Sequence, residues 1–225
     1  MILKDIVKSI ADEKIIAIIR DVCPKQIEWV VESLLEGNIK CMELAFSGGD
    51  NYDENKILKL IEAIRKKYND EVLVGAGTVM TVEQVGRAYD AGAQYMISPN
   101  VNLEVISQTK KKGCVSIPGA YSPTEIVKAY VHGADFVKVF PAGNLGASYI
   151  KSLSVSLGKI PFIAVGGVNL ENAVEFIDSG VTAVGIGGNL VDNLLIQQNK
   201  YQELAEKAKR YYTEVHKTHS KVHSC

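Results

Sequence analysis

The sequence has no surplus of basic residues and no long hydrophobic run. Its 225 residues include 25 lysines and arginines against 26 aspartates and glutamates, which gives a formal net charge of −1. Nucleic-acid-binding proteins and proteins of anionic membrane surfaces usually carry a basic patch, so we expect neither partner. No apolar segment approaches the roughly 18 residues needed to span a bilayer. Residues 1–14 are too charged for the hydrophobic core of a signal peptide.

Cysteine is also scarce, and the cysteines do not cluster. There are four: Cys23, Cys41, Cys114 and Cys225. None belongs to a Cys-x-x-Cys pair, so we interpret them as reduced thiols of a cytoplasmic protein. The polar C-terminal segment also contains His216, His219 and His223. A metal cluster there would lack a rigid framework, so we expect a frayed tail over about residues 213–225 and no bound metal.

Short β-branched runs alternate with longer amphipathic segments along the chain. The expected strands are residues 15–20, 41–46, 72–77, 94–98, 114–118, 136–140, 162–167 and 183–188. The expected helices are residues 2–12, 25–36, 53–68, 81–91, 102–111, 123–132, 146–157, 169–179 and 199–217. This order predicts an α/β fold: a single (β/α)8 TIM barrel with an extra N-terminal helix. A doubly wound open sheet is the alternative, although it usually has fewer strands. No polar linker divides the chain, so one domain over residues 1–225 is expected.

The sixth expected strand carries a lysine between two aromatic residues. Val137 and Val139 share the face that suits the helix layer, so Phe136, Lys138 and Phe140 share the inward face. Removal from water disfavours the ammonium form and lowers the pKa of such a lysine. The neutral amine is the nucleophile that a Schiff base requires. The alternatives are a lysine that extends to solvent, or one that pairs with a carboxylate in the barrel.

Two further charged residues have inward parity. Between Met42 and Leu44, Glu43 faces the interior, where a carboxylate is costly to bury unless it is paired or catalytic. Near Lys138 it would transfer protons, or it would form a structural ion pair with that lysine. Arg20 ends the first strand on the same face, and it suits either a substrate anion or an ion pair with Glu43.

Glycine-rich segments lie at the ends of three of the expected strands. Residues 75–78, Gly-Ala-Gly-Thr, would let a ligand approach the backbone and would offer the Thr78 hydroxyl, or they form only a tight turn. Residues 166–168 and 185–189 follow the seventh and eighth strands, where barrels commonly bind phosphate through backbone N–H groups. The position of this pair predicts a site for phosphate or another anion.

The chain resembles the 2-keto-3-deoxy-6-phosphogluconate (KDPG) aldolase / 4-hydroxy-2-oxoglutarate (KHG) aldolase family from about residue 5 to about residue 212. The motifs are Ile-Ala-Ile-Ile-Arg (16–20), Met-Glu-Leu (42–44), Val-Gly-Ala-Gly-Thr-Val (74–79), Ile-Ser-Pro (97–99), Ile-Pro-Gly (117–119), Ser-Pro-Thr-Glu (122–125), Val-Lys-Val-Phe-Pro-Ala (137–142), Val-Gly-Gly-Val (165–168) and Gly-Ile-Gly-Gly (185–188). Each motif is short, but their order and spacing together are specific.

The resemblance implies a class I aldolase that needs no cofactor or metal. It would cleave a 2-keto-4-hydroxy acid, such as 2-dehydro-3-deoxy-6-phosphogluconate or 4-hydroxy-2-oxoglutarate, to pyruvate and an aldehyde. Lys138 is similar to the family's Schiff-base lysine, Glu43 to its proton-transfer carboxylate, and Thr78 to the threonine that contacts pyruvate. The remaining matches are the pocket residues Pro99 and Phe140 and the anion-binding turn residues Gly166, Gly167 and Gly188. The family is typically a homotrimer.

The chain departs from the common family pattern at four positions. Ala45, Ser47, Val165 and Asn189 stand where many members carry threonine, arginine, threonine and serine. Loss of the arginine and the serine weakens the case for a phosphorylated substrate, although Arg20 would take over part of that role. We nevertheless predict that Asn189 belongs to the substrate site.

Two other functions are compatible with the same residues. One is a phosphate-binding barrel isomerase or epimerase, in which Glu43 abstracts a proton and Lys138 acts only through its charge. The other is a non-catalytic barrel that binds a keto acid or a sugar phosphate. Neither would be trapped by borohydride in the presence of pyruvate, and the binding barrel would keep much of its affinity after Lys138→Ala.

Overall fold

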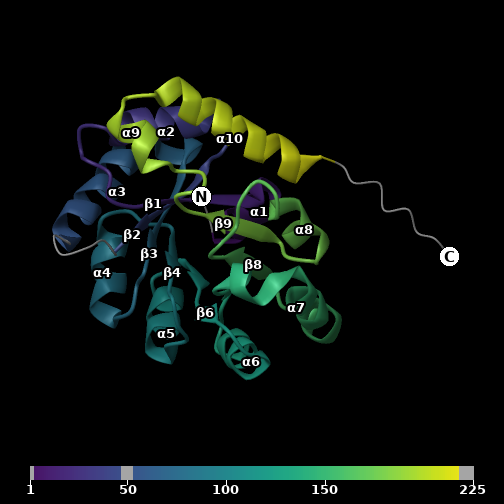
Figure 1. The fold of residues 1–225 in the computed structure, drawn as a ribbon. Helices are drawn as coiled ribbons and strands as arrows, with labels where there is room; N and C mark the ends of the chain where they lie inside the picture. Colours follow the sequence, from purple (N-terminus) through teal and green to yellow (C-terminus); the bar gives the residue numbers. More distant parts are fainter. Residues whose placement is uncertain (1–2, 47–52, 218–225) are drawn as a thin grey trace.

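The computed structural model describes residues 3–46 and 53–217, and within them nine parallel strand segments form one barrel (Figure 1). The strands are β1 (Ile15–Ile19), β2 (Cys41–Ala45), β3 (Leu73–Gly77), β4 (Tyr95–Ile97), β5 (Val115–Ile117), β6 (Gly119–Ala120), β7 (Val137–Val139), β8 (Phe162–Val165) and β9 (Ala183–Ile186). Hydrogen-bonded neighbours follow the order β5-β4-β3-β2-β1-β9-β8-β7-β6. The predicted TIM barrel is confirmed.

The fifth strand of the barrel is divided into β5 and β6 by Pro118, which has no N–H to donate. Backbone hydrogen bonds continue on both sides of the division. The Ser98 N–H donates to the Ile117 carbonyl at 3.1 Å, and the Lys138 N–H donates to the Pro118 carbonyl at 2.9 Å. This strand position therefore joins β4 to β7 and closes the ring.

Helices surround the barrel (Figure 1). They are α1 (Leu3–Glu13), α2 (Ile27–Glu36), α3 (Glu54–Tyr68), α4 (Val82–Asp90), α5 (Leu103–Lys111), α6 (Pro123–Val131), α7 (Ala142–Leu157), α8 (Ala173–Asp178), α9 (Asn193–Gln197) and α10 (Tyr201–His216), with a 3-10 turn, η1, at Asn69–Glu71. None of these helices is long and apolar enough to cross a membrane.

Two helices begin four residues away from their predicted starts, and one helix was not predicted. α7 begins at Ala142 and not at residue 146, because Gly146, with φ of 77°, joins a first helical turn to the rest. α8 begins at Ala173 and not at residue 169. It follows a turn in which the Asn169 side-chain oxygen accepts hydrogen bonds from the Glu171 and Asn172 N–H groups. α9 was not predicted as a separate helix.

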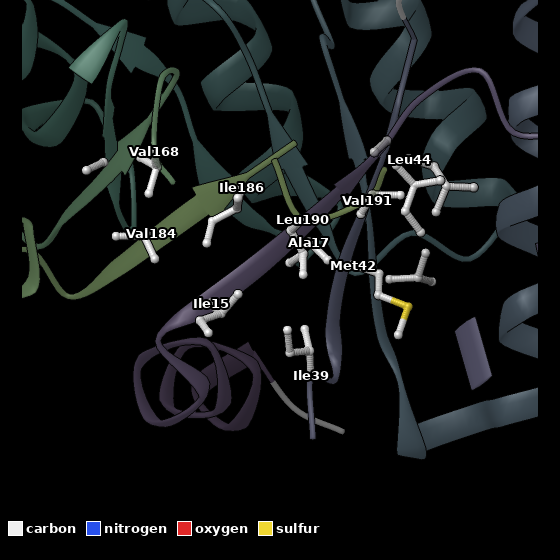
Figure 2. Close-up of a cluster of buried hydrophobic side chains, with 14 of the residues drawn as sticks. Ile15, Ala17, Ile39, Met42, Leu44, Val168, Val184, Ile186, Leu190 and Val191 are labelled. Carbon is white, nitrogen blue, oxygen red and sulfur yellow. The ribbon is translucent and has the colours of Figure 1, made fainter. Parts of the chain in front are cut away.

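Side-chain parity sorts the core into two clusters, as predicted. Met42, Val137 and Val139 face the helices in the larger cluster, and Figure 2 shows the part of that cluster around β1, β2 and β9. Ile18 and Phe136, on alternate positions, pack inside the barrel.

The N-terminal helix closes the barrel end at which the strands begin. Ile6 and Ile10 of α1 are buried among interior residues such as Cys41 and Leu73, which lie at the starts of β2 and β3. A ligand site is therefore expected at the opposite end, where the strands finish.

The C-terminal helix lies within the predicted range 199–217, and the expected fraying begins later than predicted. Residues 213–216, predicted to be frayed, belong to α10. His216 Nδ1 lies 2.9 Å from the Tyr212 carbonyl oxygen, and its Nε2 lies 3.2 Å from that of Asp12. The remaining tail residues His219, His223 and Cys225 lie outside the described residues.

Candidate active site

Strands β7 and β2 place a lysine and a glutamate inside the barrel. Lys138 is 4% exposed and Glu43 is fully buried. Both stand between residues that face the helices, so the predicted inward parity is confirmed.

The Lys138 amine lies against an aromatic ring. Its Nζ is 4.7 Å from the centroid of the Phe140 ring, and no described carboxylate forms an ion pair with it. Burial lowers the pKa of the Lys138 amine, the charge of Glu43 opposes this shift, and the charge of Arg20 adds to it. Lys138 therefore does not reach solvent, and among the described residues it has no ion-pair partner. Such a lysine gives up its proton more readily than an exposed one and is the better nucleophile.

Glu43 is buried without a hydrogen-bond partner. Neither carboxylate oxygen has one among the described residues. Burial raises the pKa of the Glu43 carboxyl, and the positive charges of Lys138 and Arg20 oppose that shift. An unpartnered buried carboxyl is costly, and such groups concentrate at functional sites. Its environment suits a group that exchanges a proton with a ligand atom.

Glycines of β3 make room for the side chains of neighbouring strands. The register places Glu43 opposite Gly75 and Ala45 opposite Gly77. A methyl group on Gly77 would lie 1.7 Å from Glu43 Oε1, and one on Gly75 would lie 2.1 Å from the Tyr95 ring. The Gly-Ala-Gly run is thus strand and not a turn. Its glycines accommodate Glu43 and Tyr95, a function that the sequence did not predict.

An open pocket of about 230 Å³ lies at the carboxyl ends of β1, β8 and β9. The predicted site residues on its wall are Arg20, Phe140, Gly166, Gly167, Gly188 and Asn189. Phe140 connects this pocket to Lys138, because its ring also contacts the Lys138 amine. Arg20 is exposed at the pocket and does not pair with Glu43, which removes that alternative.

Two glycine loops contribute free N–H groups to the pocket. Gly166 and Gly167 have φ of 89° and 75°, in the left-handed region that favours glycine. The backbone N–H groups of Gly166, Gly167 and Gly188 donate to no carbonyl of the described residues. Together with the Arg20 guanidinium, these groups can bind an anion.

Thr78 and Pro99 lie outside that pocket, after β3 and β4. Thr78 directly follows Gly77 and has a positive φ of 58°. A methyl group on Gly119 would lie 2.6 Å from the Pro99 carbonyl oxygen, so β6 packs closely on this segment. Both residues follow strands that lie between β2 and β5 in the sheet, and their contact with a ligand stays a prediction.

The departures from the family pattern fall in different places. Ala45 and Val165 are buried in the barrel interior, and Val165 also lines the pocket. Asn189 is exposed, and its side-chain amide donates to the Val168 carbonyl at 2.8 Å. Ser47 lies outside the described residues. Among the residues described, no group of three or more His, Cys, Asp or Glu side chains could hold a metal ion.

Known proteins have sequences similar to this chain. A probable 2-dehydro-3-deoxy-6-phosphogalactonate aldolase of Rhizobium meliloti is 36% identical over 180 residues, which cover 80% of this chain and 82% of that protein. The 2-dehydro-3-deoxy-6-phosphogalactonate aldolase of Escherichia coli is 33% identical, with coverage of 78% and 83%.

Solved structures of aldolases have folds similar to that of this chain. A native KDPGal structure superposes with a TM-score of 0.80 at 30% identity, covering 89% of this chain and 93% of that one. The KDPG aldolase of Legionella pneumophila, solved with pyruvate captured as a covalent carbinolamine intermediate, gives a TM-score of 0.82 at 26% identity, with coverage of 91% and 96%. A family model described as KDPG and KHG aldolase matches residues 6–207, and the chain therefore belongs to this family of aldolases.

Proposed function

We propose that this aldolase cleaves a 2-keto-4-hydroxy acid to pyruvate and an aldehyde through a Schiff base on Lys138. The observation that supports the proposal most is the combination of a buried lysine of lowered pKa with a buried, unpartnered Glu43. The carbinolamine captured in the Legionella pneumophila relative is the intermediate that precedes such a Schiff base.

In the proposed reaction, the neutral Lys138 amine adds to the C2 carbonyl carbon, and loss of water gives a protonated Schiff base. The Glu43 carboxylate accepts the proton of the C4 hydroxyl. The C3–C4 bond breaks, its electron pair forms an enamine with the iminium carbon, and C4 leaves as the aldehyde. Glu43 returns the proton to C3, and water hydrolyses the imine to pyruvate and the free amine. A carboxyl of raised pKa suits both proton transfers.

The substrate we propose carries a phosphate, as a 2-dehydro-3-deoxy-6-phospho sugar acid, and the aldehyde product is then glyceraldehyde 3-phosphate. The free N–H groups of Gly166, Gly167 and Gly188 and the Arg20 guanidinium support this choice. Relatives bear the names of phosphogalactonate and phosphogluconate aldolases. The alternative substrate is 4-hydroxy-2-oxoglutarate, which yields glyoxylate. The substrate is decided by comparing kcat/KM for 2-dehydro-3-deoxy-6-phosphogluconate, 2-dehydro-3-deoxy-6-phosphogalactonate and 4-hydroxy-2-oxoglutarate.

Borohydride reduction in the presence of pyruvate, followed by peptide mass spectrometry, tests the Schiff base. We expect a pyruvate adduct on Lys138 in the wild type and in Glu43→Gln, and none in Lys138→Ala. Lys151→Ala, which removes an exposed lysine of α7, is the matched control and should retain the adduct. No adduct on the folded wild-type protein at saturating pyruvate would refute the proposal and favour an isomerase or a binding barrel.

The homotrimer and the cytoplasmic location are also our proposals. Exposed apolar side chains on α6 and α7 offer contact area between copies, since Val131 is 68% exposed and Val155 is 83% exposed. Light scattering should give about three times the chain mass of 24.5 kDa. A mass of one chain, or recovery of the protein outside the cytoplasmic fraction, would contradict them.

A further inference from the structure

Two loops carry the N–H groups of the anion pocket, residues 166–168 after β8 and residues 187–189 after β9. An anion can accept hydrogen bonds from both loops at once only if the distance between the loops is held constant. The Asn189 side chain links them directly, because its Nδ2 donates to the Val168 carbonyl at 2.8 Å. This amide hydrogen bond is between the two loops and leaves that N–H unavailable to a ligand.

A buried tyrosine of the C-terminal helix fixes the same asparagine. The hydroxyl of Tyr211 donates to the Asn189 carbonyl at 3.1 Å, and Tyr211 is 2% exposed. The backbone N–H of Leu170 also interacts with this phenol, lowering its pKa against the raising effect of burial. Tyr211 therefore contacts Asn189 in the second loop and Leu170, two residues beyond the first loop, without lining the pocket itself.

The segment that follows the second loop is anchored in the core and to α10. Leu190 and Val191 are buried in the core cluster that Figure 2 shows. Lys207 of α10 pairs with Asp192 at 2.9 Å, immediately beyond them. With α10 fixed in this way, the Tyr211 hydroxyl stands at a defined position over Asn189.

We propose that Tyr211 and Asn189 are positioning residues that hold the two glycine loops at the separation required by the anionic end of the substrate. The identity of that substrate rests on the proposed function, but the inference itself needs only an anion in the pocket. Asn189 acts through the Val168 carbonyl, and Tyr211 acts through Asn189. Substitution of Tyr211 therefore separates loop positioning from direct contact with the ligand.

The test measures the affinity of inorganic phosphate by calorimetry or NMR titration. Tyr211→Phe and Asn189→Ala should each weaken the phosphate Kd about three- to tenfold, the range expected for one lost hydrogen bond. The double variant should be weaker by clearly less than the product of the two changes, because both bonds belong to one linkage. Tyr212→Phe is the matched control: it removes the same atom from the next residue, whose ring stacks on His216 at 4.0 Å.

A kinetic measurement excludes a merely structural effect. Tyr211→Phe should raise KM for the phosphorylated substrate with little change in kcat, and the pyruvate adduct on Lys138 should form as in the wild type. Wild-type phosphate affinity in Tyr211→Phe would overturn the inference, as would multiplicative effects in the double variant or loss of the adduct. A wild-type protein that binds phosphate but cleaves no 2-keto-4-hydroxy acid would refute the proposed function alone. One that forms the adduct but binds no phosphate would refute only this inference and the phosphorylated substrate.

Discussion

Replacement of Gly77 by alanine is the most direct test of how Glu43 is held. The added methyl carbon would lie 1.7 Å from Oε1, 2.3 Å from Cδ and 2.6 Å from Cγ of Glu43. Non-bonded carbon atoms normally keep about 3.5–4.0 Å apart, so the carboxyl must move by roughly 1–2 Å. Glu43 has no solvent-exposed position to turn into at its site, because the residue is fully buried.

The size of the expected effect follows from this displacement. Overpacking of a dense core costs about 1–3 kcal/mol, so Gly77→Ala should lower the free energy of unfolding by that amount. Misplacement of a reacting group by about 1 Å can reduce a rate about a hundredfold, and we expect kcat for cleavage to fall by at least that factor. Lys138 is not displaced in this account, so the pyruvate adduct should still form under borohydride.

The assay combines urea unfolding with the rate of pyruvate release. Gly86→Ala is the matched control, because a methyl group there would meet nothing within 4 Å. Gly86 lies inside α4, where alanine replaces glycine with a gain of about 0.5–1 kcal/mol. If Gly77→Ala kept kcat within about twofold and stability within about 0.5 kcal/mol, the tight contact at Glu43 would not position the carboxyl.

Three further outcomes follow from the same contacts. The pKa of Glu43 is raised above its ordinary 4.5, so the folded state binds this proton more tightly than the unfolded state. Urea titrations should therefore show that the wild type loses stability relative to Glu43→Gln as the pH rises above 4.5. A stability difference that does not depend on pH would contradict this. Gly167→Ala should weaken phosphate binding without affecting the pyruvate adduct, because its φ of 75° is strained for alanine and its methyl group would lie 3.0 Å from the Gly143 Cα; unchanged phosphate affinity would argue against the pocket. Asp135→Asn should cost about 1.5–3 kcal/mol in unfolding experiments, because a partly buried ion pair with Lys110 at 2.6 Å is lost, whereas a loss of kcat in the folded variant would show that this end of the barrel also affects the site.

The sequence predicted that Lys138 and Glu43 face the barrel interior because strand parity is a local property. Side chains alternate with a period of two, so the valines beside Lys138 assign its direction without knowledge of the partner strands. Glu43 follows by the same rule between Met42 and Leu44. The environment of the two residues could not be predicted in the same way, because the unpartnered state of Glu43 depends on residues from other strands.

Local patterns also explain the errors in the helices and the fifth strand. Residues 114–118 were predicted as one strand, but Pro118 has no N–H and divides the strand there. The first turn of α7, Ala142–Leu145, is too short to show a helical period before Gly146. The five residues of α9 are too few for a periodic pattern, and only the cap at Asp192 marks its start.

The contacts that support the site join residues far apart in the chain, and for these the sequence offers only an indirect signal. Two glycines with the same parity in one strand are unfavourable for the strand itself, so Gly75 and Gly77 indicate that neighbouring side chains approach closely. Which side chains do so is decided by the β2–β3 register, and a slip of one residue would turn Glu43 toward the helices. The bond from Tyr211 to Asn189 has no comparable signal, because it depends on how α10 packs after the barrel has closed. The inward direction of Lys138 and Glu43 is thus set by alternation within single strands, whereas their pKa values and the separation of the two glycine loops are set by closure of the barrel.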